Sequence, residues 1–114
     1  MKYEDMINSI IEQIRKHISS TAPNKYGCRI APRIVCADGF SVSVQGSETH
    51  YCRPRETLDD GNYYMVECGY PTNPVEEWRD YADGDYDEGP VSVYACVPIE
   101  LVAEVIFKHG GFSA

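Results

Sequence analysis

The segment RIVCADGFSVSVQ, residues 33–45, carries the clearest structural signal in this chain of 114 residues. Asp38-Gly39, near its middle, is a favoured pair for a two-residue turn between antiparallel strands. After the turn, every other residue is apolar (Phe40, Val42 and Val44) and the residues between them are polar. This two-residue period is typical of a strand with one buried and one polar face. The segment therefore predicts a β-hairpin.

Other segments extend the hairpin into a sheet. Pattern and turn residues predict strands at Arg33–Ala37 before the turn, at His50–Cys52 up to Pro54, at Tyr63–Tyr70 and at Val91–Val97. A short helical turn is expected at Val75–Tyr81. Because the strands are joined by tight turns, the sheet should be antiparallel, with three to four strands.

Two amphipathic helices frame the strands. The first is predicted from Tyr3 to Ile18, because apolar residues recur there at steps of three and four. The second begins at Pro98 and ends at Gly110-Gly111, where glycine is a common C-terminal cap. The sequence thus predicts a single α+β domain spanning residues 1–114, an antiparallel sheet flanked by an N-terminal and a C-terminal helix packed on one face. The other sheet face, with Ser41, Ser43 and Gln45, is expected to be exposed.

Composition excludes several classes of protein. A net charge of −8 and a pI near 4.7 argue against direct binding of nucleic acid or of an anionic membrane. No apolar run approaches the roughly 18 residues of a membrane-spanning helix, and the N-terminus does not have the pattern of a signal peptide. The five cysteines form no C-x-x-C pair, so we expect reduced thiols in a cytoplasmic protein without a zinc site.

The negative charge is concentrated in one segment, residues 76–88. Seven acidic residues and one arginine give this segment a net charge of −6, and aromatic residues are interleaved with the acids. The electric field of such a segment attracts a basic partner. Acidic residues spaced by aromatic residues can also imitate the phosphates and bases of a nucleic acid. The candidate partner-binding residues are Glu76, Glu77, Trp78, Asp80, Tyr81, Asp83, Asp85, Tyr86, Asp87 and Glu88.

Two other interpretations of the acidic segment remain open. It can be a solvated loop that keeps the protein soluble, or a site for a divalent cation. The spacing of its carboxylates and glycines departs from that of a calcium-binding EF-hand loop. No resident metal or cofactor is therefore expected.

Catalytic motifs are lacking in the sequence. It contains no phosphate-binding glycine loop and no G-x-S-x-G motif. His50 and Cys52 form the only local His/Cys pair, and on a strand their side chains would be about 7 Å apart, too far for a nucleophile and its base. His17 and His109 fall at the ends of the predicted helices, where a charged imidazole stabilises the dipole. We therefore expect a protein that is not an enzyme.

Several strand, turn and cap segments resemble a family of small uncharacterised proteins encoded by bacterial phages and mobile elements. The matching segments are residues 39–45, 51–55, 66–71, 93–100 and 109–111. The compact acidic form is similar to anti-CRISPR and other anti-defence inhibitors, many of which occupy nucleic-acid-binding surfaces. The resemblance concerns the fold and assigns no catalytic or binding residue.

This resemblance and the acidic segment together imply a phage-type anti-defence protein in the cytoplasm of a bacterial host. Its expected partner is a host defence protein, such as a CRISPR effector, whose basic nucleic-acid-binding surface the acidic segment would block. The alternative is a metal-binding or regulatory accessory domain of a mobile element without inhibitor activity. A homodimer is a further possibility, since an exposed sheet face or edge strand can self-associate.

Overall fold

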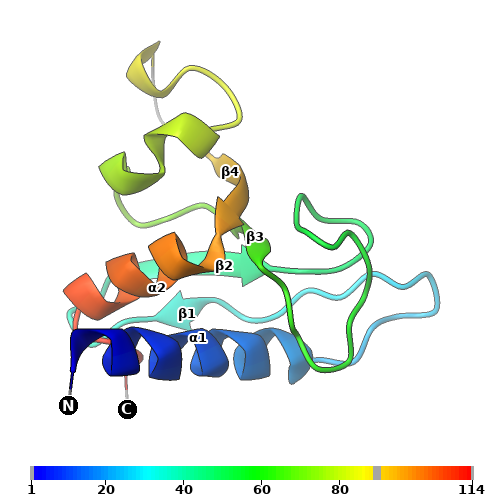
Figure 1. The fold of residues 1–114 in the computed structure, drawn as a ribbon. Helices are drawn as coiled ribbons and strands as arrows, with labels where there is room; N and C mark the ends of the chain where they lie inside the picture. The colour runs from blue at the N-terminus through cyan, green and yellow to red at the C-terminus, as the bar shows by residue number, and fades with distance from the viewer. Residues whose placement is uncertain (1, 89–90, 114) are drawn as a thin grey trace.

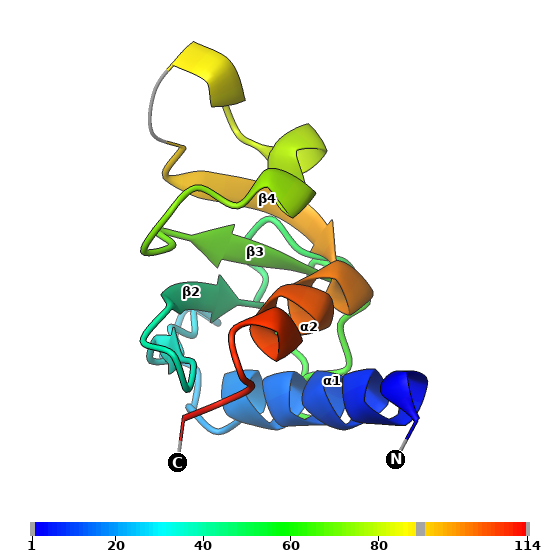
Figure 2. The ribbon, with the colours of Figure 1, turned by 90° about the vertical axis from the view of Figure 1, so that its left-hand side faces the viewer.

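The computed structural model describes residues 2–88 and 91–113 and has the predicted α+β architecture. Four antiparallel strands form one sheet in the order β1-β2-β3-β4. Both helices cover the same side of this sheet and pack against each other (Figures 1 and 2). The elements are α1 (Tyr3–Ser19), β1 (Ile34–Val35), β2 (Ser41–Gln45), β3 (Met65–Gly69), the 3-10 helices η1 (Glu76–Tyr81) and η2 (Tyr86–Glu88), β4 (Val93–Pro98) and α2 (Ile99–Lys108).

The core lies between the helices and the inner face of the sheet. The predicted isoleucine stripe of α1 is buried, including Ile14 and Ile18 at 0% exposure. It packs with the inward-facing valines of β2, such as Val42 and Val44, and with the apolar face of α2. The apolar faces that the sequence predicts for these elements therefore pack into one core, as the predicted fold requires.

The β1–β2 hairpin forms where it was predicted, but its loop is longer by one residue. The Cys36 amide donates to the Phe40 carbonyl at 2.7 Å, and the Gly39 amide donates to the Cys36 carbonyl at 3.0 Å. These bonds close a loop of three residues, 37–39, in which Gly39 adopts a left-handed φ of 95°. The prediction of a two-residue turn was therefore wrong, and β1 is shorter than expected.

The strand predicted at His50–Cys52 is absent. The Cys52 amide donates to the His50 carbonyl at 2.9 Å, so the chain bends here instead of extending. Arg53 forms an isolated bridge to Met65, and the Tyr51 carbonyl accepts the Cys96 amide of β4. Because the Cys52 amide is used in this local hydrogen bond, it cannot donate to a neighbouring strand, as a β-ladder would require.

The outer face of the sheet is less exposed than predicted. Ser41 and Ser43 lie on this face but are half-buried, and Gln45 is only 4% exposed. Its side-chain amide bonds both the N–H and the C=O of Ala31, each at 2.8 Å. The loop before β1 therefore covers this end of the outer face, which corrects the prediction for Gln45.

Neighbouring segments cover parts of both sheet edges. At β1, the Ser113 amide donates to the Val35 carbonyl at 2.8 Å. At β4, the Asp83 amide donates to the Val93 carbonyl at 2.9 Å. Covered edges are less able to pair with a second chain, so they do not favour a dimer formed through an edge strand.

Candidate functional site

The acidic segment forms a small lobe that projects beyond the sheet next to β4, at the top of Figure 1. We define this acidic lobe as residues 76–87. It consists of η1, the turn that follows it and the first two residues of η2. The predicted helical turn at residues 75–81 is confirmed as η1. Glycine and proline at positions 89 and 90 also predict a break in regular structure, but these two residues lie outside the described part of the chain.

Trp78 anchors η1 in the core. Its ring is fully buried and meets the Tyr94 ring edge-on, with the ring centroids 5.5 Å apart. Its indole N–H donates to the Leu101 carbonyl at 3.2 Å, and the Tyr94 hydroxyl accepts the Val75 amide at 3.2 Å. Trp78 was predicted to offer contact area to a partner, and its burial corrects that expectation. Trp78 therefore cannot contribute to a contact surface.

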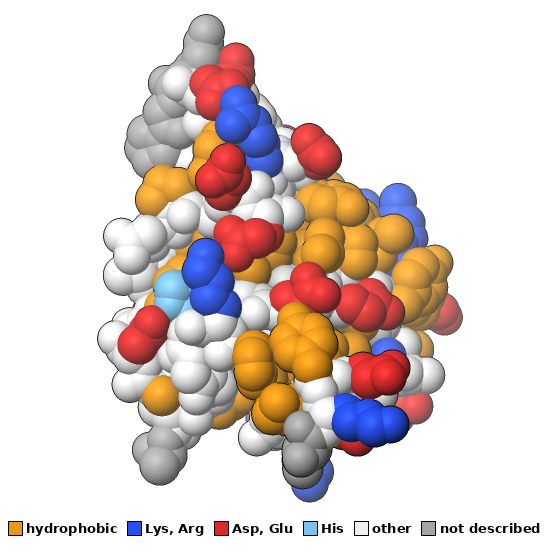
Figure 3. Space-filling model, turned by 60° about the vertical axis from the view of Figure 1, so that its left-hand side comes forward, with side chains coloured by type: hydrophobic (Ala, Val, Ile, Leu, Met, Phe, Trp, Pro, Cys, Tyr) orange, Lys and Arg blue, Asp and Glu red, His pale blue; other side chains and the backbone are white. Residues whose placement is uncertain are grey.

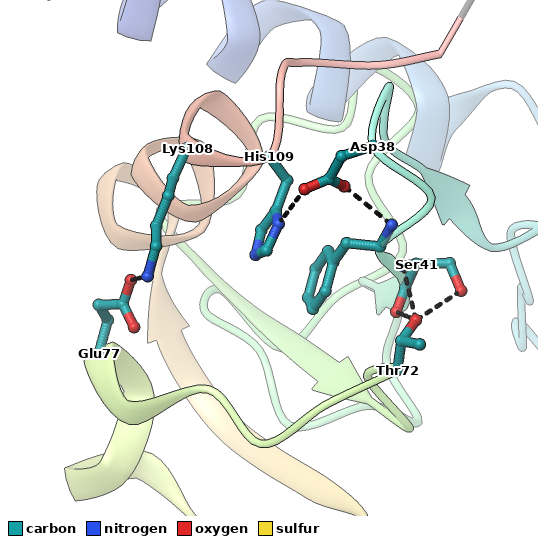
Figure 4. A network of polar contacts seen from close by, with 7 residues as sticks. Asp38, Ser41, Thr72, Glu77, Lys108 and His109 are labelled. Atoms are coloured by element: carbon teal, nitrogen blue, oxygen red, sulfur yellow. Dashed lines mark hydrogen bonds and ion pairs between the residues drawn. The ribbon is translucent and has the colours of Figure 1, made fainter.

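An ion pair joins the lobe to the end of α2. Lys108 Nζ lies 3.1 Å from Glu77 Oε2 (Figure 4). Partial burial acts to raise the pKa of Glu77, but its own backbone N–H and the Lys108 ammonium outweigh this effect and lower the pKa. Glu77 is therefore engaged within the molecule, and its carboxylate is held in the charged form.

Arg79 holds the second half of the lobe. Its guanidinium pairs with Asp87 and lies over the Tyr86 ring, 5.0 Å from the ring centroid. The Asp87 amide donates to Asp85 Oδ1 at 3.0 Å. Tyr81 and Tyr86 are half-buried and pack against the core, so each ring is only partly accessible.

The remaining carboxylates of the lobe face solvent. Glu76, Asp80, Asp83 and Asp85 are exposed, and none has an ion-pair partner among residues 2–88 and 91–113. The Glu88 side chain, also predicted to contact a partner, lies outside the described part of the structure. Four exposed negative charges are thus displayed on a segment that is fixed to the core.

Acidic residues that the sequence argument missed extend this surface. Glu100 and Glu104 are exposed on α2, and η1 lies beside that helix. Figure 3 shows acidic side chains spread from the upper part of the molecule down over this face, with a few basic side chains among them. The signal available in the sequence was the i,i+4 spacing of Glu100 and Glu104 on the polar side of a predicted amphipathic helix.

The His50/Cys52 pair is not arranged for nucleophilic catalysis. His50 Nδ1 lies 2.6 Å from the Ser47 hydroxyl, and Cys52 Sγ contacts the Ser47 carbonyl oxygen at 3.2 Å. Cys52 is fully buried, and burial raises the pKa of its thiol. A buried, protonated thiol is a poor nucleophile toward a dissolved substrate.

Two hollows on the described surface lie apart from the lobe. One of them, about 470 Å³, runs along the polar side of α1 between Glu12 and Asp60. A smaller one, about 260 Å³, lies between Asp38, Thr72 and His109. Within the described residues, no three His, Cys, Asp or Glu side chains gather to hold a metal ion. The cation interpretation of the acidic segment therefore has no ligand cluster to support it.

Comparison of the chain with protein families, with curated proteins and with solved structures found no match. No helix in the described part of the chain is long and apolar enough to span a membrane.

Proposed function

We propose that this protein acts by binding, and that the acidic lobe docks on a basic surface of a nucleic-acid-binding protein. The proposal rests on the exposure of four carboxylates in the acidic lobe and on their charge, which is unpaired within the described chain. Glu76, Asp80, Asp83 and Asp85 are exposed and have no ion-pair partner among the described residues. Lysine and arginine clusters that hold nucleic acid are the complementary surface, because they are built to bind spaced negative charges.

The anchoring of the lobe supports this role. Trp78 fixes η1 to the core, and Arg79 connects η1 to η2 through Asp87. A surface that is ordered before it meets its partner loses less conformational entropy on binding than a flexible tail does. The lobe therefore suits rigid docking driven by charge.

The first partner to test is a CRISPR effector, since the chain resembles small phage-encoded proteins and anti-defence inhibitors. Under this proposal the protein competes with guide or target nucleic acid for the basic channel of the effector. Nucleic acid bound beforehand should then prevent capture of the effector by this protein.

The test is a pull-down with the immobilised protein from a bacterial lysate that contains CRISPR effectors. Captured proteins are identified by mass spectrometry after washes at about 0.05 M and about 0.5 M salt, because exposed charges more than a Debye length apart are screened at the higher value. We expect an effector that is retained at low salt and released at high salt. Retention that does not depend on salt, or an empty resin, would contradict charge-driven docking.

The informative variant is Asp80→Asn/Asp83→Asn/Asp85→Asn. It removes three exposed charges and leaves the Arg79–Asp87 pair intact. An asparagine at position 85 still offers a carbonyl oxygen that can accept the Asp87 amide, so the local turn is preserved. Capture of the effector should weaken severalfold.

A matched control changes the same number of charges elsewhere. Glu56, Asp59 and Asp60 are exposed and lie outside the lobe, and an asparagine at position 60 can still accept the Asn62 amide. Glu56→Gln/Asp59→Asn/Asp60→Asn should leave capture close to that of the parent protein. Equal loss in both variants would show an effect of net charge alone.

A further inference from the structure

Cys52 and Cys96 lie on backbone segments that are far apart in the sequence and adjacent in space. The Cys96 amide donates to the Tyr51 carbonyl at 2.9 Å, and Cys52 is the next residue after Tyr51. The bond lengths of the intervening atoms place the two Cα atoms within about 7 Å of each other. A disulfide usually joins Cα atoms roughly 4.4–6.8 Å apart. The two backbones are therefore close enough for a disulfide with little movement.

A β-bulge explains why the Cys96 amide leaves the sheet. Val66 pairs with Val97, and Cys68 pairs with Tyr94, so Ala95 and Cys96 share the single position opposite Glu67. Cys96 has a φ of 50°, a left-handed conformation that residues other than glycine rarely adopt. At the bulge its N–H bonds Tyr51 instead of the neighbouring strand.

Glu67 fixes the other side of the same segment. Its Oε1 accepts the Tyr51 amide at 3.1 Å. Both backbone groups of Tyr51 are thus held by β3 and β4, the N–H by Glu67 and the C=O by Cys96. These two hydrogen bonds of Tyr51 therefore hold the next residue, Cys52, beside the bulge.

The two thiols differ in access to solvent. Cys52 is fully buried, whereas Cys96 is half-buried. Burial, as the largest cause, raises the pKa of Cys52, and the nearby Cys96 and Glu67 add to this effect. The effect of Cys96 on the pKa of Cys52 agrees with the short distance between the two backbone segments. Of these two thiols, Cys96 is the more accessible to a dissolved oxidant.

We propose that Cys52 and Cys96 are an oxidisable pair that forms a disulfide when the protein meets a peroxide. In the first step the Cys96 sulfur attacks one peroxide oxygen, the O–O bond breaks, and Cys96 sulfenic acid and water form when the substrate is hydrogen peroxide. In the second step the Cys52 sulfur attacks Cys96 Sγ, the S–O bond breaks and a second water leaves. Both thiol protons end in the two water molecules, and the peroxide is the oxidant.

Of the three remaining thiols, Cys28 is half-buried like Cys96, and the other two are buried. Cys36 and Cys68 are buried, and burial raises the pKa of each, that of Cys36 to about 11. Cys28 accepts a hydrogen bond from the Thr49 hydroxyl at 3.3 Å. Neither of the two deeply buried thiols should react before Cys96, because reaction with an oxidant needs access and thiolate character.

The experiment uses the purified, reduced protein treated with hydrogen peroxide. Free thiols are then blocked with N-ethylmaleimide, and the protein is digested without reduction and analysed by mass spectrometry. We expect a linked peptide pair containing Cys52 and Cys96, about 2 Da lighter than the two thiol peptides and separated by dithiothreitol. A different cysteine pair, a chain-to-chain link through Cys96, or an unreacted Cys96 would overturn the proposal.

Single variants test the order of the two steps. In Cys52→Ser, Cys96 should accumulate as sulfenic and then sulfinic acid, because no resolving thiol is near. In Cys96→Ser, Cys52 should remain a free thiol. Cys28→Ser is the matched control and should form the same link as the parent. Circular dichroism confirms that each variant is folded, and Cys52→Ala replaces Cys52→Ser if the buried hydroxyl prevents folding. Rapid oxidation of Cys52 in the absence of Cys96 would contradict the assigned roles.

Discussion

Asp38 and His109 face each other across the β1–β2 turn and the end of α2, with Asp38 Oδ2 2.7 Å from His109 Nδ1 (Figure 4). The imidazole also stacks on the Phe40 ring, with the centroids 4.1 Å apart. The other carboxylate oxygen of Asp38 accepts the Phe40 amide at 2.9 Å. The pair therefore joins the hairpin loop to the C-terminal helix, two parts of the chain that the sequence separates by 71 positions.

This contact predicts a dependence of stability on pH. The Phe40 amide and then His109 lower the pKa of Asp38 in the folded state. A carboxyl whose folded pKa is lowered contributes stability above its unfolded pKa, about 3.9, and this contribution is lost as the pH falls through the folded value. Asp38→Asn should thus lower the free energy of unfolding at pH 6, and the difference from the parent should shrink near pH 3. Urea unfolding at both pH values measures it.

Asp59→Asn is the control for Asp38→Asn, because Asp59 is exposed and has no ion pair among the described residues. It should change the free energy of unfolding little at either pH. A constant deficit for Asp38→Asn at both pH values would mean that the charge of Asp38 is not the source of the effect.

Gly61 allows the loop after Asp60 to contact α1. Its φ is 68°, and a Cβ atom built on it would lie 2.2 Å from the backbone oxygen of Arg15. We expect Gly61→Ala to cost at least ~2 kcal/mol, since left-handed strain and a clash with backbone act together. Gly39 also has a positive φ, but nothing lies within 4 Å of its Cβ position. Gly39→Ala should cost only about 1 kcal/mol. Equal losses in urea unfolding would exclude the clash with Arg15.

Trp78 couples the acidic lobe to the core, so its replacement should affect both. Trp78→Phe removes the bond to Leu101 and part of the buried ring, and we expect a loss of roughly 1–3 kcal/mol. Amide exchange of residues 76–83 should also become faster relative to that of β2. Hydrogen-exchange mass spectrometry and urea unfolding give the two readouts. Tyr26→Phe, at a ring that is 72% exposed, is the control and should stay within about 0.5 kcal/mol. Unchanged exchange in the lobe would contradict the anchoring role.

The sequence predicted those features that depend on local patterns. The isoleucines of α1 and the alternation at Phe40, Val42 and Val44 are local, and both proved correct. The roles of Trp78 and Gln45 depended on distant partners. Acidic neighbours made Trp78 look like a surface residue, whereas Leu101 and Tyr94 bury it. Gln45 fitted the polar half of a strand, but its amide was needed to satisfy the backbone of Ala31.

Tyr70 is another position where distant contacts override a local preference. Its φ is 51°, and this conformation is held by bonds from its amide to the Ser92 carbonyl and from Arg33 to its own carbonyl, each 2.6 Å long. Because Tyr70 is 63% exposed, little burial offsets the left-handed strain. Asparagine tolerates this conformation, so Tyr70→Asn should stabilise the protein by ~0.5–1 kcal/mol and raise its melting temperature by a few degrees. Tyr64→Asn, at a similarly exposed ring with an ordinary backbone, should give no such gain. A loss of stability in Tyr70→Asn would show instead that contacts of the ring hold this turn in place.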